Sequence, residues 1–436
     1  MKNVIQSQLA DAVSMELPEL TEREARIPAI PNKAYAVIGM RRSGKTYYLY
    51  QTIKRYLAQG VPRSKLVYFN FEDERLAEIN LKDLHWITDE YYAMFPENRS
   101  GKVYFFFDEI QLVDGWERFV RRLLDTENVA IYVSGSSAKM LSREIASSLR
   151  GRSVEIPIYP YSFREYLKHH SISYPRSLKR INKQTRSLLE NQVLKYLQCG
   201  GFPEAQTVVP QDHQLLLQGY VDAVIFRDII ERYGVTNIAV LRALIRHLIK
   251  NTGSLFTVNK FYNQLKSQGF KVGKATLHEY LSYLHDSFLV SSASIHTRSE
   301  RKRMVNPVKP YIIDTGLVRS FQLRNDQDLG HLLENCVFME LSRRDAKVDY
   351  LSTPSGFEVD FLAELPDGTR KAIQVAADVS DPSTLERQCR ALADLHTELG
   401  DIEMLLINLS EEATIEKAGP TIRLIPTWKW LLDFQP

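Results

Sequence analysis

The feature that most constrains the fold of this chain is an eight-residue loop, residues 39–46, which reads GMRRSGKT. It matches the pattern GxxxxGK[ST] in full, between a short apolar segment (residues 33–38) and a helical pattern (residues 46–57). Glycine at positions 39 and 44 permits backbone angles that other residues resist, so the loop can turn its N–H groups toward phosphate oxygens. The pattern predicts a strand–loop–helix unit that binds the phosphates of a nucleotide.

The chemistry of phosphate binding suggests a role for each residue of this loop. We expect Lys45 to bridge the β and γ phosphates of ATP, and the Thr46 hydroxyl to coordinate Mg²⁺. A tight strand–helix turn without a ligand is the alternative, which the complete pattern in its strand–helix context disfavours. The other residues expected to contact the nucleotide are Gly39, Met40, Arg41, Arg42, Ser43, Gly44 and Tyr47.

A second element is the very apolar segment 103–107, which runs directly into Asp108 and Glu109. Two adjacent carboxylates at the end of a buried strand are costly unless they have partners. We expect Asp108 to hold Mg²⁺ together with Thr46, and Glu109 to orient and deprotonate the attacking water. An exposed acidic turn after a core strand is the alternative interpretation, and the complete phosphate loop upstream disfavours it.

Polar and basic residues further along the chain are candidates for the γ-phosphate. Ser134 and Ser136 follow the apolar segment 130–133, and either hydroxyl could position the attacking water. Arg150 and Arg152 are candidates for an arginine that neutralises developing charge in the site of a neighbouring subunit. A small-residue turn and two surface arginines are the alternatives, and the sequence does not choose between the members of either pair.

The order of the expected elements predicts an α/β fold. Continuous apolar strands that alternate with helices are typical of a parallel sheet covered on both faces. In the first part of the chain, strands are expected at residues 33–38, 66–71, 103–107 and 130–133. In the last part, they are expected at residues 348–351, 357–364, 370–376, 403–409 and 421–425.

Changes in composition divide the chain into five segments. Three short amphipathic helices are expected at residues 240–250, 258–268 and 274–289, followed by a strand and a basic stretch, a layout compatible with a winged helix. The predicted segments are a lead-in (1–30), a P-loop core (31–160), a helical lid (161–235), a winged-helix-like domain (236–305) and a C-terminal α/β domain (306–436).

The bulk composition sets limits on partners and compartment. The net charge of +3 neither demands nor excludes nucleic acid, so any basic footprint must be local. Cys199, Cys336 and Cys389 lie far apart, which argues against a disulfide framework or a zinc site. We find no signal pattern at the N-terminus and no apolar stretch of about 18 residues, so we expect a soluble, cytoplasmic protein without a membrane partner.

Further motifs follow the loop in a fixed order: FDEIQ (107–111), SGSS (134–137), LRGR (149–152), PYSFRE (160–165), GGFPE (200–204), KPYIIDTG (309–316) and EVDF (358–361). With them the chain resembles prokaryotic AAA-superfamily ATPases that carry a C-terminal domain of unknown function with a restriction-endonuclease-like fold. The resemblance covers nearly the whole chain, and GGFPE and EVDF are its most particular stretches. It implies an ATPase core, a helical lid, a winged-helix-like insert and a nuclease-like domain, but no established biological role.

A basic cluster near the end of the winged-helix-like segment is a candidate for contacts with DNA phosphates. The alternative is a solvated basic loop, or a winged helix that serves only to pack domains together. Lys271 and Lys274 could extend the same footprint. The cluster consists of Arg298, Arg301, Lys302, Arg303 and Lys309.

The resemblance also implies a nuclease-like metal site, for which the chain has only part of the expected residues. Asp360 fits the metal-binding carboxylate of one strand, and Glu334 is a plausible carboxylate from a helix. On the next strand the neutral Gln374 stands at the acidic position, and Ala376 stands at the position of the lysine that supports the attacking water. We therefore predict a catalytically degenerate domain that could still bind DNA or another protein.

The leading hypothesis is an Mg²⁺-dependent ATPase that couples hydrolysis to movement of C-terminal DNA- or protein-binding domains. One alternative is a nucleotide-dependent binding switch with very slow turnover, and another is an ATP-fuelled nuclease in defence or repair. Assembly into a homo-oligomer is compatible with a site that takes an arginine from a neighbouring subunit, and the sequence does not decide it.

Overall fold

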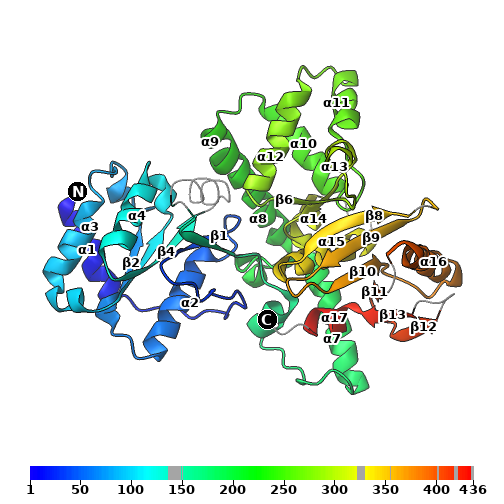
Figure 1. Ribbon diagram of the computed structural model, residues 1–436, viewed down its shortest axis with the longest axis horizontal. Coiled ribbons are helices and arrows are strands. Elements are labelled where there is room, and N and C mark those ends of the chain that lie inside the picture. Colours follow the sequence, from blue (N-terminus) through cyan, green and yellow to red (C-terminus); the bar gives the residue numbers. More distant parts are fainter. Residues whose placement is uncertain are drawn as a thin grey trace. The chain divides into compact units, whose positions relative to one another are not determined.

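The computed structural model describes residues 1–135, 149, 151–321, 329–353, 355–399, 402–416 and 421–433. These residues form two compact units. Unit 1 is Met1–Tyr159 with Asp286–Phe288, and unit 2 is Pro160–His285 with Leu289–Pro436 (Figure 1). The finer division of unit 2 at residues 235 and 305 stays a prediction.

Unit 1 contains, among its described residues, a five-stranded parallel sheet in the order β2-β3-β4-β1-β5. The four strands predicted in this part of the chain are confirmed. The fifth, β5, was not predicted, because it pairs only with β1 and most of its residues are half-exposed, which leaves no continuous apolar run. The strands are β1 (Ala34–Ile38), β2 (Leu66–Asn70), β3 (Val103–Asp108), β4 (Val129–Gly135) and β5 (Ser153–Pro157).

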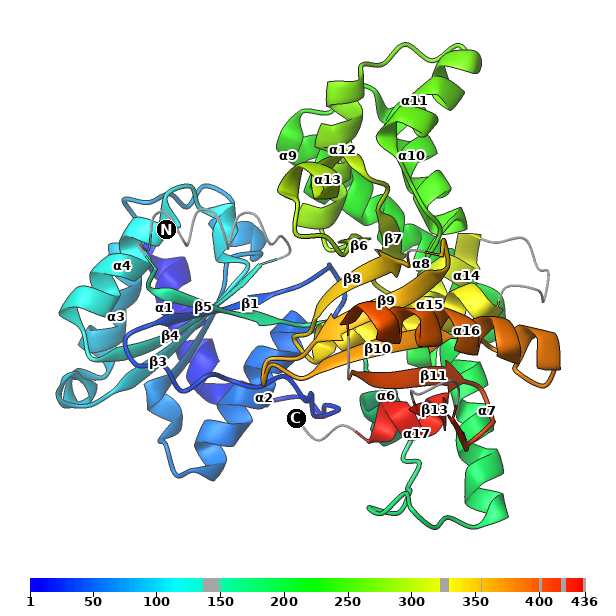
Figure 2. The ribbon, with the colours of Figure 1, turned by 45° about the vertical axis from the view of Figure 1, so that its right-hand side comes forward.

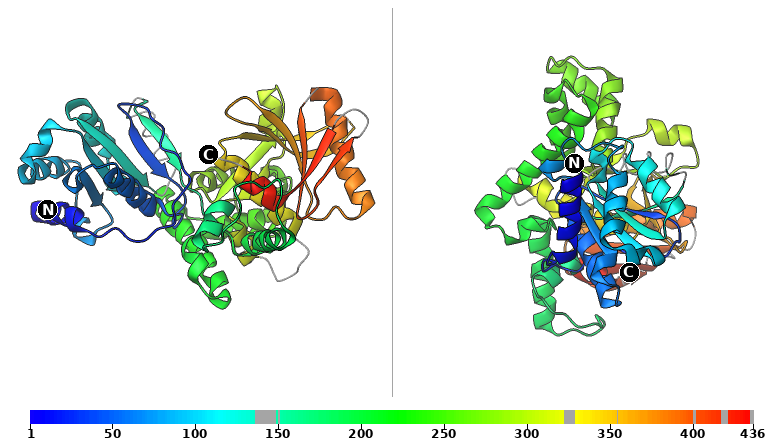
Figure 3. Two further views of the ribbon diagram at one scale, coloured as in Figure 1. Left: turned by 90° about the horizontal axis from the view of Figure 1, so that it is seen from below. Right: turned by 90° about the vertical axis from the view of Figure 1, so that its left-hand side faces the viewer.

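Helices cover both faces of this sheet because alternate strand residues point to opposite sides. Phe105 and Phe107 of β3 contribute to one apolar core with α3 (His85–Met94) and α4 (Trp116–Thr126), and Phe106 contributes to the other core with α2 (Lys45–Ala58). The helix expected in the lead-in is α1 (Lys2–Ser14), which packs against β2 and α3 (Figure 3). Short 3₁₀ turns are η1 (Arg63–Lys65), η2 (Glu74–Leu76), η3 (Pro96–Ser100) and η4 (Ile110–Leu112).

Unit 2 begins with helices. A capping box starts the first of them, since the Ser162 hydroxyl accepts from the Glu165 N–H and the Glu165 carboxylate accepts from the Ser162 N–H. The helix α8 continues without a break into a π-helical stretch, η6, and then α9. The bounds are α6 (Phe163–His169), α7 (Lys183–Cys199), η5 (Glu204–Thr207), α8 (Pro210–Ala223), η6 (Val224–Ile230) and α9 (Glu231–Tyr233).

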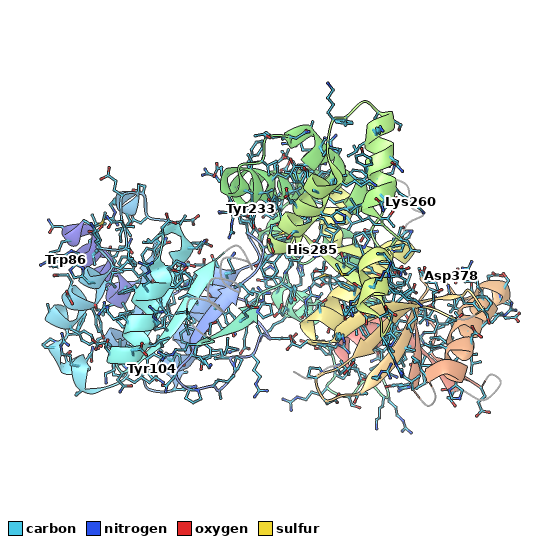
Figure 4. All side chains as sticks on the ribbon, turned by 45° about the horizontal axis from the view of Figure 1, so that its top comes forward. Trp86, Tyr104, Tyr233, Lys260, His285 and Asp378 are labelled. Atoms are coloured by element: carbon cyan, nitrogen blue, oxygen red, sulfur yellow. The ribbon has the colours of Figure 1, made fainter. Side chains whose placement is uncertain are left out.

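The three amphipathic helices predicted next are confirmed as α10 (Ile238–Lys250), α11 (Val258–Ser267) and α12 (Lys274–Asp286). Tyr233 stacks on Tyr283 of α12, and Lys260 lies on α11 (Figure 4). An antiparallel hairpin follows, made of β6 (Val290–Ile295) and β7 (Lys309–Ile312), with α13 (Glu300–Val305) in the connection between them. Phe256 forms an isolated bridge to Val308 beside this hairpin.

The hairpin joins a larger mixed sheet, in which eight strands of the described residues run in the order β12-β13-β11-β10-β9-β8-β6-β7 (Figure 2). The strands expected here are confirmed, and α16 supplies Leu392 and Leu395 to the core on one face. The bounds are α14 (Thr315–Phe321), α15 (Leu329–Arg343), β8 (Lys347–Ser352), β9 (Glu358–Glu364), β10 (Arg370–Val375), α16 (Pro382–Leu399), β11 (Glu403–Asn408), β12 (Ala413–Glu416), β13 (Thr421–Pro426) and α17 (Thr427–Leu432).

Candidate nucleotide-binding site and a buried charged cluster

The glycine-rich loop connects the end of β1 to the start of α2, as the sequence predicts. Gly44 precedes the helix in the left-handed region, with φ at 101°. Gly39 has φ at 152°, and a Cβ placed on it would lie 2.2 Å from the Ile158 carbonyl oxygen. Only glycine fits at position 39, because the neighbouring backbone occupies the space of a side chain.

Lys45 lies inside the loop. Its side chain is buried, and Nζ donates to the carbonyl oxygens of Gly39 at 3.1 Å and Met40 at 3.2 Å. The same ammonium lies 3.9 Å from Oε1 of Glu109. The loop therefore holds a buried positive charge over its own backbone, within ion-pair distance of the second carboxylate of the β3 end.

Asp108, the first carboxylate of the β3 end, is fixed by hydroxyl groups from three other elements. Tyr68 of β2 donates to Oδ2 at 2.7 Å, Ser134 of β4 donates to Oδ1, and the Thr46 hydroxyl at the start of α2 also bonds to this carboxylate. Burial raises the pKa of Asp108 and the neighbouring Glu109 raises it further, while the three hydroxyls oppose the shift. The predicted pair Thr46 and Asp108 thus meets in the structure.

Glu109 is the second carboxylate and takes an unusual backbone conformation, with φ at 53°. Its N–H donates to the Ser134 hydroxyl at 3.0 Å, and Gln111 donates to its Oε2. A non-glycine residue in the left-handed region costs free energy, which the surrounding contacts must offset. The turn therefore holds Glu109 toward Lys45.

The residues proposed from the sequence as candidates for the γ-phosphate are described only in part, and those that are described contact other protein groups. Ser134 is fully buried; its hydroxyl donates to the Asp108 carboxylate and accepts from the Glu109 N–H, so it orients the first carboxylate and the backbone of the second. Arg152 forms an ion pair with Asp125, at the end of α4 in its own chain. Ser136 and Arg150 lie outside the described residues.

The remaining residues of the loop and its flank have varied exposure. Arg41 lies 3.6 Å from the exposed Glu72 carboxylate, and Arg42 adopts a positive φ of 68°. Ser43 is fully buried, whereas Tyr47 is half exposed on the first turn of α2. The Tyr47 side chain is thus accessible from solvent, whereas the Ser43 side chain is not.

Two residues of this site were missed in the sequence. Tyr68 lies in an apolar strand, where an aromatic residue is ordinary, so nothing in the pattern marks its hydroxyl. Arg23 lies in the polar stretch before β1, yet its guanidinium is buried and donates to the Ser43 carbonyl at 2.8 Å. A single arginine in a charged lead-in carries no sequence signal.

The basic cluster of unit 2 is smaller than predicted. Arg298, Arg301 and Lys302 are exposed in the connection between β6 and β7, and Lys271 and Lys274 are exposed before α12 and at its start.

Two predicted members of this cluster lie elsewhere. Arg303 donates to the Asp349 carboxylate at 2.9 Å and is engaged with β8. Lys309 is buried and forms ion pairs with three carboxylates. It therefore does not belong to an exposed basic surface.

Lys309 is at the centre of a buried charged cluster. Its Nζ lies 3.1 Å from Glu334, 2.7 Å from Glu358 and 3.1 Å from Asp360. The structure thus brings together Glu334 and Asp360, the two carboxylates selected from the sequence. Burial raises the pKa of Glu334 to about 7, with the charge on Asp360 as the second cause and Lys309 opposing both.

The neutral Gln374 lies beside this cluster, where it contacts the backbone of Asp360. Its Oε1 accepts from the Asp360 N–H at 3.2 Å, while Asp360 Oδ2 accepts from the Val375 N–H at 2.9 Å. In the described part of the chain no group of three or more His, Cys, Asp or Glu side chains is arranged to hold a metal ion.

Two further predictions concern the whole chain. None of Cys199, Cys336 and Cys389 forms a disulfide in the described part of the chain. Across the described ranges, no helix is long and apolar enough to span a bilayer.

Two stretches of this chain match family models. Residues 31–167 match the family model described as "AAA domain", and residues 190–328 match that of a domain of unknown function, DUF8612. An uncharacterized protein of Methanocaldococcus jannaschii, MJ1544, is 32% identical over 429 residues, which cover 95% of this chain and 92% of that protein.

A second relative and one solved structure complete the comparison. An uncharacterized protein of Haemophilus influenzae is 32% identical over 350 residues, 79% of this chain and 82% of that protein. The Walker-type ATPase of Pyrococcus abyssi aligns with 74% of this chain and 96% of its own, with 13% identity and a TM-score of 0.41.

Proposed function

The chain belongs to the AAA-type P-loop ATPases with a C-terminal domain of unknown function, and we propose that it binds ATP with Mg²⁺ and hydrolyses the γ-phosphate at the loop of residues 39–46. The observation that carries this proposal is the convergence of Lys45, Thr46, Asp108 and Glu109 at one place. Lys45 lies 3.9 Å from Glu109, and Thr46 bonds to Asp108. These four side chains supply a phosphate ligand, two magnesium ligands and a base.

The residues present fit a bound nucleotide and metal ion. Lys45 is held by loop carbonyls, which a phosphate would replace as its partners, and the loop N–H groups precede a helix N-terminus that favours anions. Asp108 and Thr46 would hold Mg²⁺, which when bound neutralises charge on the β and γ phosphates. Glu109 is the group that would take a proton from water.

The direct test is phosphate release by purified protein with ATP and Mg²⁺. Glu109→Gln keeps the shape of the side chain and removes the base, so turnover should fall by about 10²- to 10⁴-fold while nucleotide binding persists. Lys45→Ala should weaken binding itself. If Glu109→Gln turned over ATP at the wild-type rate, the assigned base would be wrong.

The second candidate is a nucleotide-dependent switch with slow turnover, which the contacts of Glu109 favour. Its carboxylate is engaged by Gln111 and faces Lys45, and Arg152 is engaged by Asp125. An ATPase that needs an arginine from a neighbouring subunit would also hydrolyse ATP slowly as an isolated chain, and so would mimic the switch. Turnover per chain that rises with protein concentration would support assembly-dependent hydrolysis, and constant slow turnover would support the switch.

We also propose that α10, α11, α12 and the β6–β7 hairpin form a winged helix that contacts DNA phosphates. The bridge between Phe256 and Val308 adds the short strand that such a domain places before its second helix. Arg301→Glu with Lys302→Glu should weaken binding to duplex DNA and lower its salt dependence. The control is Lys347→Gln, which removes an exposed positive charge from β8, outside the basic cluster. Arg303→Gln does not serve as a control, because it would also break the ion pair with Asp349.

We further propose that the C-terminal domain has lost nuclease activity. The order α15–β8–β9–β10–α16–β11 supports the restriction-endonuclease-like fold that the family resemblance implies, but Lys309 stands among the carboxylates and Ala376 replaces the expected lysine. Plasmid DNA with Mg²⁺ or Mn²⁺ should remain uncut. Cleavage that Asp360→Ala abolishes would overturn the proposal.

A further inference from the structure

Arg23 connects the phosphate loop to the end of unit 1. Its guanidinium is buried and donates through one nitrogen to the Ser43 carbonyl at 2.8 Å, and through the other to the Tyr159 carbonyl. Ser43 belongs to the phosphate loop, and Tyr159 is the last residue of unit 1 before Pro160. One rigid, planar side chain thus bridges two backbone segments that are distant in sequence.

The backbone of Arg23 is itself fixed to the helix that follows the loop. Gln51 of α2 accepts from the Arg23 N–H at 2.7 Å and donates to the Arg23 carbonyl at 3.0 Å. The Tyr48 hydroxyl of the same helix donates to the Ala25 carbonyl at 3.0 Å. Because α2 begins at Lys45, directly after this part of the loop, these bonds fix the position of Arg23 relative to the loop that it contacts.

The segment 158–161 is held against the loop on its unit 1 side. The Ile158 N–H donates to the Ile38 carbonyl at 2.7 Å, and the Ile158 carbonyl lies against Gly39, where it leaves no room for a Cβ. Two residues of the phosphate loop therefore contact this segment, Gly39 directly and Ser43 through Arg23.

The same segment is held by unit 2 on the other side of the boundary. Arg343 of α15 donates to the Pro160 carbonyl at 3.1 Å, and the Tyr196 hydroxyl of α7 donates to the Tyr161 carbonyl at 2.6 Å. The Tyr161 N–H donates to the Gly201 carbonyl at 2.6 Å. Ile158 and Tyr159 are therefore hydrogen-bonded within unit 1, and Pro160 and Tyr161 are hydrogen-bonded within unit 2.

We propose that Arg23 couples the occupancy of the phosphate loop to the segment 158–161, which joins the two units, so that nucleotide binding reaches unit 2 through this arginine. This inference rests on the nucleotide binding proposed above. The Ser43 carbonyl and the Gly44 N–H belong to one peptide group. When that N–H donates to a phosphate, the carbonyl becomes a stronger acceptor for Arg23, because hydrogen bonds in a chain polarise one another.

Hydrogen exchange on the full-length protein tests this coupling without any variant. The amides to follow are Ile158 on the unit 1 side and Tyr161 on the unit 2 side, with and without a non-hydrolysable ATP analogue and Mg²⁺. The coupling predicts that the analogue slows exchange at Tyr161 by about threefold or more, since it restrains local opening of the segment.

Arg23→Gln then separates coupling from binding. We expect it to weaken binding of a fluorescent ATP analogue by about tenfold, the loss of one charged hydrogen bond to the loop. At saturating analogue the exchange response at Tyr161 should disappear. The matched control is Arg26→Gln, an exposed arginine of the same lead-in, which should keep both affinity and response.

The outcomes distinguish the two proposals. A wild-type protein that binds no nucleotide would overturn the proposed function and the coupling with it. A wild-type protein that binds nucleotide without any change at Tyr161 would overturn the coupling alone, as would an Arg23→Gln variant that keeps the wild-type response. Arg23→Lys, which retains the buried charge but loses the planar fork, should bind nucleotide and lose most of the response.

Discussion

The Tyr68 hydroxyl of β2 donates a 2.7 Å hydrogen bond to the Asp108 carboxylate at the end of the neighbouring strand β3. Tyr68 is buried and also bonds to Tyr50 of α2. Together with Ser134 and Thr46, this contact fixes the orientation of the carboxylate that we assign to magnesium. The carboxylate proposed to bind magnesium is thus positioned by the sheet and by the helix that follows the phosphate loop.

Removal of this hydroxyl should therefore change the use of magnesium before it changes the fold. We expect Tyr68→Phe to raise the Mg²⁺ concentration needed for half-maximal ATP hydrolysis by about threefold to tenfold, the effect of one lost hydrogen bond to a charged group. Phosphate release across a magnesium titration measures it. Tyr56→Phe is the matched control, because it removes a 2.7 Å bond to Tyr132 within the same unit, away from the carboxylates. An equal effect of both variants would contradict the assignment.

The sequence predicts four of the five strands of the unit 1 sheet and the central residues of the candidate site, because these depend on local patterns. The phosphate loop is one short stretch of sequence, and so is the apolar run before Asp108 and Glu109. The strand before the loop and the helix after it follow from hydrophobic periodicity. Tyr68 and Arg23 could not be predicted in the same way. Tyr68 reaches Asp108 because β2 pairs with β3, and Arg23 is held by contacts between the lead-in and α2. These contacts join residues distant in sequence, so no local sequence pattern predicts them.

Lys309 shows the opposite error, in which a local pattern misleads. It follows a run of arginines and lysines, so the sequence favours a solvated basic cluster. The structure instead makes it a residue of β7 and places it beside Glu334 of α15 and Asp360 of β9. Position in a strand of the second sheet decides its burial, and that depends on contacts between residues distant in sequence.

The buried cluster gives a second prediction. Lys309→Met leaves the carboxylates of Glu334, Glu358 and Asp360 facing one another without their cation, so we expect a loss of about 3–5 kcal/mol in the free energy of unfolding. Urea unfolding followed by fluorescence measures it. Lys371→Met is the control, since it removes a partly exposed 3.0 Å ion pair with Glu403 and should cost no more than about 1 kcal/mol.

The same variant tests whether the lysine stands in for a divalent cation. Mn²⁺ should raise the unfolding midpoint of Lys309→Met and leave that of the wild-type protein unchanged, because only the variant has carboxylates in need of a cation. Stabilisation of the wild-type protein by Mn²⁺ through these residues, lost on Asp360→Ala, would contradict this interpretation.

A third prediction concerns pH. The pKa of Glu334 is raised from 4.5 to about 7, mainly by burial, so the folded protein binds a proton that the unfolded chain has released. The contribution of Glu334 to the free energy of unfolding is fully present below pH 4.5 and is lost as the pH rises through about 7. The free energy of unfolding should fall over this interval, and Glu334→Gln should flatten the curve.

Asp314 adds to the same trend at lower pH, because burial raises its pKa from 3.8 to about 6. The slope of the free energy of unfolding against pH, between pH 6 and 7, should therefore depend mostly on Glu334. Urea midpoints at half-unit intervals of pH, for wild type and Glu334→Gln, resolve it. Glu364→Gln, at the exposed end of β9, should keep the wild-type slope. If Glu334→Gln also kept this slope, the charged cluster would not be its source.

The last prediction concerns the motif GGFPE, in which the backbone of Gly201 is tightly packed. A Cβ on Gly201 would lie 2.3 Å from the Tyr161 carbonyl oxygen, and the Gly201 N–H donates to Asp314 at 2.6 Å. Gly201→Ala must therefore push one backbone segment away from another, and we expect a loss of about 2 kcal/mol or more in the free energy of unfolding. Gly219→Ala is the matched control in α8, where a Cβ meets no atom within 4 Å. It should stabilise the protein by about 0.5–1 kcal/mol, because alanine favours a helix interior. Urea unfolding of both variants measures the difference, and a Gly201→Ala protein as stable as Gly219→Ala would show that the segment 160–161 is free to move away from Gly201.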